Sequence, residues 1–480
     1  MKLTSNLIAK LFLAALVSIV CVGVQAAETK AATAASAGWA EVDITPPLGI
    51  ALGGRGAPAT ASKKVLDPLV AQVLYLKDAN GVGFVLVSLD LIGIAHELSE
   101  KIRLDIVHEL GVPWDLVVLN CSHTHSGPYM IRSLMAGVGP APQIEIDYFK
   151  SLEEKIISAT RAAAKSMSPV KVEVFEGKSQ VAINRRGKNK LGARGIIPDP
   201  DGPFDENLWV MKLSAQNGRA PAVIFSYACH PVIVYGFAIA ALSADFPGVT
   251  RNFLREQLGR KVHAQFVQGL AGDVRPRAVA DLPNKRFRTS TADDLQKAGA
   301  GLANDALAAL RGEGKTLSLN IAGAGDRAFL PRDKPPARDH YEKMRVEGAS
   351  KTNSFLTGVS DYWLSCYDSG LGFSKGDAWP VGLIRLADNQ WVCYFAGEPC
   401  VEWRAKITQW LPGKQIVPWG YCQEGIGYLP TTEMLPEGGY EVVESNRARL
   451  SSPAQHAPGI DPAIRESLLR QLSFINSEVK

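Results

Sequence analysis

The chain has 480 residues, of which 46% are hydrophobic and 21% are charged. These proportions are typical of a globular protein of one to three domains, and they exclude a largely disordered chain. The formal net charge is only +4, and no stripe of basic residues interleaved with aromatic ones occurs. We therefore expect no nucleic-acid partner.

The N-terminus has the features of a secretory signal. Two lysines flank the start of an apolar run over 11–24, and the small residues Ala26 and Ala27 follow it. This order predicts a signal peptide over 1–27 and export to the periplasm or the extracellular space. A retained membrane anchor is the alternative, but the run is short for a membrane span. No later segment is apolar enough to span, so we expect no transmembrane segment after signal removal and a folded catalytic domain over 28–480.

Apolar runs and helical periodicity predict an alternation of strands and helices along the chain. The expected strands cover 38–47, 70–76, 83–89, 115–119, 170–175, 208–213, 222–228, 264–267, 381–386, 391–395 and 415–421. The expected helices cover 94–110, 144–167, a segment that ends near Gly259, 293–310, 401–411 and 462–475. Residues 330–360 show few periodic signals, and we expect a lid or a lobe there. The whole pattern predicts an α/β fold: one large domain of mixed β-sheets flanked by helices.

A His-x-His pair follows one of the buried strands. His123 and His125 come directly after the apolar run 115–119 and before Gly127-Pro128. In extended backbone, alternate side chains share a face, so the two imidazoles can point into one site. Imidazole is the commonest nitrogen ligand for zinc. The pair alone is a moderately specific sign of a metal site.

Four other polar residues, His230, Asp273, Glu398 and Tyr428, also follow the ends of apolar strands. Open α/β sheets place their binding sites at the carboxyl ends of strands. Two histidines and one glutamate form a standard ligand set for catalytic zinc, which leaves one coordination position for water. The sequence therefore predicts a zinc site at the C-terminal ends of the strands.

The same stretches carry a resemblance to a known family. They occur in the order found in the neutral, non-lysosomal ceramidases, which are zinc amidases that hydrolyse the N-acyl bond of ceramide. The resemblance covers about residues 42–440. The matching pieces are 122–128, Asn184-Arg185, Cys229-His230-Pro231, 243–248, 271–274, Gly397-Glu398 and Gly427-Tyr428.

The resemblance implies a role for each matched residue. It implies that zinc is bound by His123, His230, Glu398 and Tyr428. It also implies that His125 and Arg185 lie beside the metal and contact the substrate or the developing oxyanion, and that Tyr440 lines the site.

Arg275 stands where the family has its nucleophilic serine. The family motif is Gly-Asp-Val-Ser-Pro, whereas this chain has Gly272-Asp273-Val274-Arg275-Pro276. A guanidinium stays protonated and cannot attack a carbonyl. Two interpretations of Arg275 are open: a clamp for an anionic group of the substrate, or an ion pair with Asp273. The chain also ends short of the immunoglobulin-like C-terminal domain of the family, and we expect that domain to be absent.

These observations predict an exported zinc-dependent hydrolase that cleaves an amide (N-acyl) bond by metal-activated water. His125 would move the proton, and Arg185 or Arg275 would stabilise the oxyanion. We expect a small-molecule, lipid or glycoconjugate substrate. Two alternatives are a metal-dependent hydrolase of a glycoside or other carbohydrate conjugate, and a non-catalytic binding protein on the same scaffold.

Overall fold

The computed structural model describes residues 34–54, 60–130, 141–370, 372–446, 450 and 454–477. The signal peptide predicted over 1–27 lies outside these residues. Among the described helices, none combines the length and the apolar character that crossing a membrane requires.

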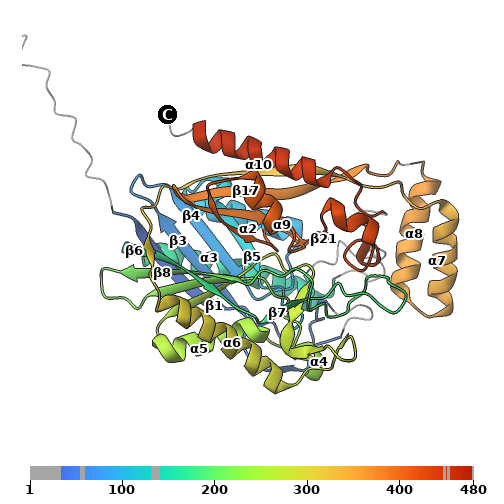
Figure 1. The fold of residues 1–480 in the computed structure, drawn as a ribbon, viewed down its shortest axis with the longest axis horizontal. Helices are drawn as coiled ribbons and strands as arrows, with labels where there is room; N and C mark the ends of the chain where they lie inside the picture. The colour runs from blue at the N-terminus through green and yellow to red at the C-terminus, as the bar shows by residue number, and fades with distance from the viewer. Residues whose placement is uncertain are drawn as a thin grey trace, which may run out of the picture.

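A mixed nine-stranded β-sheet forms the centre of the protein (Figure 1). Its strands run in the order β11-β9-β8-β6-β1-β3-β4-β5, with the short β15 beside β6. The outer pairs β4–β5 and β9–β11 are parallel, and the other pairs are antiparallel. The strands are β1 (Ser36–Asp43), β3 (Val70–Lys77), β4 (Gly83–Leu89), β5 (Val117–Cys121), β6 (Ser168–Lys178), β8 (Asn207–Ala215), β9 (Ala222–Tyr227), β11 (His263–Gln268) and β15 (Lys315–Thr316).

A second sheet of four strands, in the order β16-β17-β18-β20, packs against one face of the large sheet. An apolar cluster fills the space between them, and it includes Leu74 and Leu86 from the large sheet and Ile384 and Val392 from the small one. The strands of the small sheet are β16 (Ala322–Pro331), β17 (Gly376–Ala387), β18 (Gln390–Phe395) and β20 (Gln415–Trp419).

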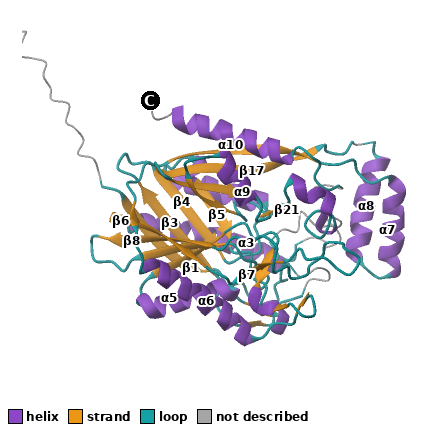
Figure 2. Ribbon diagram, viewed as in Figure 1, coloured by secondary structure: helices purple, strands orange, loops and turns teal. Residues whose placement is uncertain are grey.

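Helices cover the two outer faces, so the protein has four layers in the order helix, sheet, sheet, helix (Figure 2). The large sheet is covered by α2 (His96–Leu110), α3 (Gln143–Lys165), α5 (Asp245–Leu258) and α6 (Ala292–Leu310). The small sheet is covered by α9 (Trp403–Trp410) and α10 (Ile460–Ser477). This arrangement confirms the predicted α/β class with mixed sheets flanked by helices.

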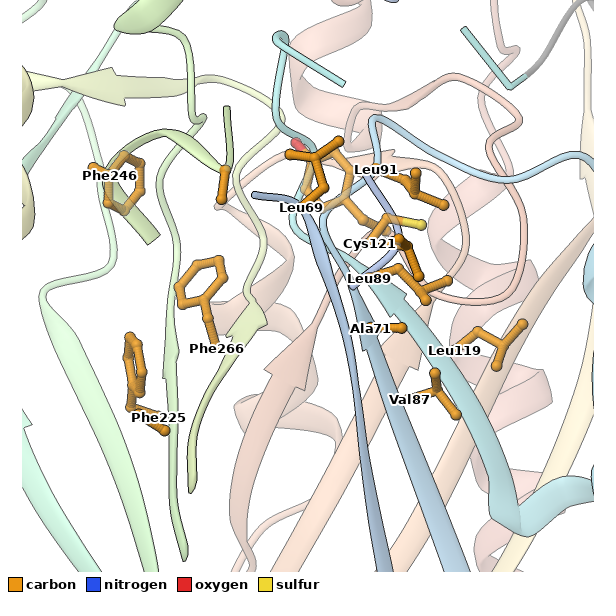
Figure 3. Packing of buried hydrophobic residues seen from close by; sticks show 14 of the residues in the cluster. Leu69, Ala71, Val87, Leu89, Leu91, Leu119, Cys121, Phe225, Phe246 and Phe266 are labelled. Carbon is orange, nitrogen blue, oxygen red and sulfur yellow. The ribbon is translucent and has the colours of Figure 1, made fainter. Parts of the chain in front are cut away.

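The central strands are apolar along their whole length because both of their faces are buried. In β3, Val73 and Tyr75 pack under the helices, whereas Leu74 and Leu76 pack against the small sheet. Alternate residues of a strand point to opposite faces, and a strand covered on both sides therefore has a continuous apolar sequence. Figure 3 shows Ala71, Val87 and Leu119 side by side on β3, β4 and β5, with Phe225, Phe246 and Phe266 packed beyond them.

Residues 330–360, where we expect a lid or a lobe, are largely helical in the structure, which the sequence pattern did not indicate. Most of this stretch forms α7 (Arg338–Ser350) and, together with the residues that follow, α8 (Ser354–Asp368), which pack against each other as a helical hairpin (Figure 1). The helices were missed because α7 buries only Tyr341, Met344 and Gly348, too few apolar positions for a clear period of 3.6 residues. Strand β16 was also missed, since its sequence is rich in glycine and alanine, which are depleted in strands.

Candidate metal centre

The predicted ligand residues meet where strands of both sheets end. His123 follows β5, His230 follows β9, and Glu398 follows β18 as the first residue of the short β19 (Glu398–Pro399). Strand β19 pairs in parallel with β21 (Tyr428–Leu429), which places Glu398 opposite Tyr428. The large sheet thus contributes the two histidines, and the region after the small sheet contributes the carboxylate.

Glu398 Oε2 lies 3.2 Å from Nε2 of His123 and 3.3 Å from Nε2 of His230. The other ring nitrogens are fixed by the backbone, with His123 Nδ1 at 2.5 Å from the oxygen of Ile92 and His230 Nδ1 at 2.5 Å from that of Ala271. A carbonyl oxygen only accepts hydrogen bonds, so each Nδ1 carries the proton and each Nε2 directs its lone pair toward Glu398. This is the tautomer that a metal ligand requires.

The donor set fits a tetrahedral zinc ion. Burial and the nearby Arg185 lower the pKa of His230 to about 3, so its imidazole is neutral and its lone pair faces the carboxylate. Zinc bonds of about 2.0–2.1 Å place tetrahedral donor atoms about 3.3–3.4 Å apart. The two distances to Glu398 agree with that edge length.

His125 lies beside this set, as the resemblance implied. One of its ring nitrogens lies within 4.8 Å of ligand nitrogens of His123 and His230. Its Nδ1 lies 2.9 Å from the oxygen of Gly54. Gly54 has φ +74°, and a Cβ atom at this position would lie 2.5 Å from His125 Nδ1. Gly54 therefore leaves room for the His125 ring and fixes it through the hydrogen bond to its carbonyl oxygen, a role that the sequence did not predict.

Arg185, Tyr428 and Tyr440 form one packed group next to Glu398. Arg185 donates from Nη2 to the hydroxyl of Tyr428 at 3.1 Å and from Nε to Glu441 at 2.8 Å. The Tyr428 hydroxyl is also hydrogen-bonded to Glu398, and the ring of Tyr440 lies 5.5 Å from that of Tyr428. The structure brings all three side chains together, and Glu441 balances the buried charge of Arg185.

Arg275 does not pair with Asp273. It belongs to β12 (Val274–Pro276), and its Nη2 donates to the hydroxyl of Tyr235 at 3.1 Å. The carboxylate of Asp273 instead accepts from Asn184 Nδ2 and from the backbone N–H of Val401. Two interpretations of Arg275 were open, and the ion pair with Asp273 is absent from the described residues. The clamp for an anionic group of the substrate stays a prediction.

Two buried amide side chains hold the strand ends together, and the sequence analysis predicted no role for either of them. Asn120 of β5 accepts from the backbone N–H of Gln268 at 2.8 Å and donates to the oxygen of Gly420 at 2.8 Å. Gln268 of β11 donates from Nε2 to the oxygens of both Ser122 and Cys229, at 2.8 Å each. Ser122 directly precedes His123, and Cys229 directly precedes His230. The side-chain amide of Gln268 therefore sets the separation of the two histidines.

Tyr421 is a further site residue that the sequence reading missed. Its ring centroid lies 4.4 Å from that of His123. Its backbone has φ +56°, and His123 has φ +65°, in the left-handed region that costs a non-glycine residue about 1–3 kcal/mol. Together with His123, Glu398 and Glu424, it lines a cavity of about 30 Å³ behind the ligands. The only sequence signal for it is its position two residues after β20.

A second group of ligand-type side chains, Asp273, Cys400 and Glu402, lies within 4.8 Å of one another. Burial and the proximity of Asp273 raise the pKa of Glu402 to about 9. Glu402 therefore keeps its proton at neutral pH and shares a hydrogen bond with Asp273. The two carboxyl groups thus form an acid pair with a single negative charge.

The fold is shared with known ceramidases. The structure is similar to the crystal structure of neutral ceramidase from Pseudomonas aeruginosa, with a TM-score of 0.69, 16% sequence identity, and coverage of 90% of this chain and 73% of that chain. A ceramidase complexed with C2 gives a TM-score of 0.65 at 16% identity, covering 90% of this chain and 74% of the other. No protein-family model matches the sequence. The resemblance seen in short motifs therefore extends to the fold.

Proposed function

We propose that this protein is a zinc-dependent hydrolase that cleaves an amide (N-acyl) bond with metal-activated water. The observation that carries the proposal is the convergence of His123, His230 and Glu398, whose donor atoms lie 3.2 and 3.3 Å apart with both Nδ1 atoms fixed by carbonyls. The fold shared with ceramidases supports the same reaction type. By analogy, a lipid amide is one candidate substrate.

Zinc would be held by His123, His230, Glu398 and Tyr428. When bound, it supplies Lewis-acid polarisation of the substrate carbonyl and makes water nucleophilic near neutral pH. Burial, followed by the effects of His123 and His230, keeps the pKa of His125 well below its usual range, so this imidazole enters the reaction neutral and can accept the proton of the attacking water. Its hydrogen bond to Gly54 fixes the ring for that transfer.

The arginines and tyrosines have complementary roles in this proposal. Arg185 donates to the hydroxyl of Tyr428 and so holds this proposed ligand in place beside Glu398. Tyr440 packs on Tyr428 and restricts its position. Arg275 replaces the serine of the resembling family, so the reaction proceeds without an acyl-enzyme.

Metal analysis of the Glu398→Gln variant tests the proposal. The parent protein should contain about one zinc per chain, and the variant should lose metal and amide hydrolysis together, because a neutral amide is a poorer ligand than a carboxylate. Glu173→Gln, on β6 away from the centre, is the control. A parent protein without zinc, or a variant with full metal content and full turnover, contradicts the proposal. Hydrolysis of glycosides without any amide cleavage contradicts the substrate class.

We also propose export, on the basis of the N-terminal sequence. The mature protein should begin near Ala27, as an intact-mass measurement on exported material would show. A mass that still includes residues 1–26 argues against a cleaved signal.

A further inference from the structure

Two arginines approach the metal centre, and their surroundings differ. Arg185 is fully buried and paired with Glu441 at 2.8 Å. Arg275 is largely buried, yet within the described residues no ion pair to a carboxylate is found for it. Its hydrogen bond goes to the neutral hydroxyl of Tyr235, and its Nε is buried without a hydrogen-bond partner in the described part of the chain.

The internal residues that the structure does not describe contain no acidic side chain that could serve as a counter-ion. These residues are 55–59, 131–140, 371, 447–449 and 451–453. The nearest acidic residue in sequence, Asp273, is occupied by Asn184, Val401 and Glu402. Taking a charge out of water without a partner costs several kcal/mol. A guanidinium held in this way is therefore expected to be matched by an anion that binds from outside.

The position of Arg275 fits a substrate-binding role. Its partner Tyr235 lies on the short helix α4 (Val234–Phe237), and the ring of Tyr235 lies 5.8 Å from that of His125. Asp245 fixes this helix by accepting from the N–H groups of Ile233 and Val234. The ring of Phe287 covers the guanidinium at 5.2 Å. Arg275 and Tyr235 are both partly exposed, and Tyr235 lies beside His125.

We propose that Arg275 and Tyr235 form a subsite for a carboxylate carried by the amide that is cleaved at the neighbouring metal centre. This inference rests on the proposed function and narrows its substrate to the class of N-acylated amino acids and similar carboxylate-bearing amides. The planar fork of an arginine matches a carboxylate bidentately, and the side chain of Arg275 is partly exposed beside Tyr235. Arg185 already forms an ion pair with Glu441, so Arg275 is the cation that binds the carboxylate of the substrate.

Binding of two matched probes tests this subsite. N-acetylglycine carries the carboxylate, and N-acetylglycinamide is its neutral counterpart. Calorimetry on the protein as purified should show at least about tenfold tighter binding of N-acetylglycine, the size of a charge-assisted hydrogen bond. Arg275→Gln should abolish this preference and leave the affinity for N-acetylglycinamide unchanged. The matched control is Arg277→Gln. Arg277 lies two residues from Arg275 and donates to the backbone oxygen of Gln180.

The outcomes separate this inference from the proposed function. An Arg275→Gln variant that keeps the preference overturns the subsite, as does a parent protein that binds both probes equally or does not bind N-acetylglycine. Zinc content and amide hydrolysis are measured on the same samples. Hydrolysis of neutral amides by a zinc-loaded protein without carboxylate preference rejects the subsite alone. An Arg275-dependent preference in a protein without zinc rejects the metal proposal alone.

Discussion

Gln268 is the residue whose replacement tests how the site is positioned. Its amide touches no proposed ligand side chain, but it bonds to the oxygens of Ser122 and Cys229, the residues before the two histidines. Outer contacts of this kind change metal affinity by about 10- to 100-fold when they are lost. We therefore expect Gln268→Ala to weaken zinc binding about 10- to 100-fold, measured by competition with a chromophoric chelator.

The control for this prediction lies on the same strand. Gln265 is also fully buried in β11, and its amide bonds to Ser88 and Gln72, away from the metal centre. Gln265→Ala should lower stability without a change in zinc affinity. Equal losses of zinc affinity in both variants would show that Gln268 acts only through general stability.

The proposed ligands could be found from the sequence, and the residues that position them could not. His123, His230 and Glu398 stand out because polar residues directly after apolar strands are locally visible. The role of Gln268 depends on partners 146 and 39 residues away in the chain. The left-handed backbone of Tyr421 could not be predicted either, because the position carries a tyrosine and this conformation favours glycine.

At the scale of elements, the sequence best predicted the strands that are buried on both faces. Strands β3, β4 and β5 are buried along nearly their whole length, and their apolar runs gave bounds within about two residues. The pattern failed for α7, which has one narrow buried stripe, and for β16, which is composed largely of small residues. The short strands β19 and β21 have no pattern of their own because two residues cannot show a period. Their pairing nevertheless joins Glu398 to Tyr428.

At the scale of the whole molecule, the site joins the two sheets. His123 and His230 follow strands of the large sheet, and Glu398 follows a strand of the small one. The acid pair crosses the same boundary, since Asp273 follows β11 of the large sheet and Glu402 is the N-cap residue of α9 against the small sheet. The titration of Glu402 is therefore linked to unfolding of the whole protein.

Glu402→Gln should remove a pH dependence of global stability. The folded protein holds the Glu402 proton up to a pKa of about 9, because of burial and the nearby Asp273, whereas the ordinary value is 4.5. As the pH rises between these values, the unfolded chain releases this proton and the folded chain keeps it. The stabilisation is therefore complete below the ordinary pKa and is lost as the pH rises toward about 9. Each pH unit corresponds to about 1.4 kcal/mol, so the contribution of Glu402 to the free energy of unfolding should fall by about 2 kcal/mol between about pH 6.5 and pH 8. Histidines and cysteines also titrate near this range, and their contribution cancels when the parent is compared with Glu402→Gln. The glutamine amide can donate to Asp273 without titrating, so the variant should show a flatter profile in urea unfolding and should be more stable than the parent at pH 8.

Glu313→Gln, at an exposed position, should leave the slope unchanged. An unchanged slope in Glu402→Gln would show that Glu402 is ionised in the folded protein.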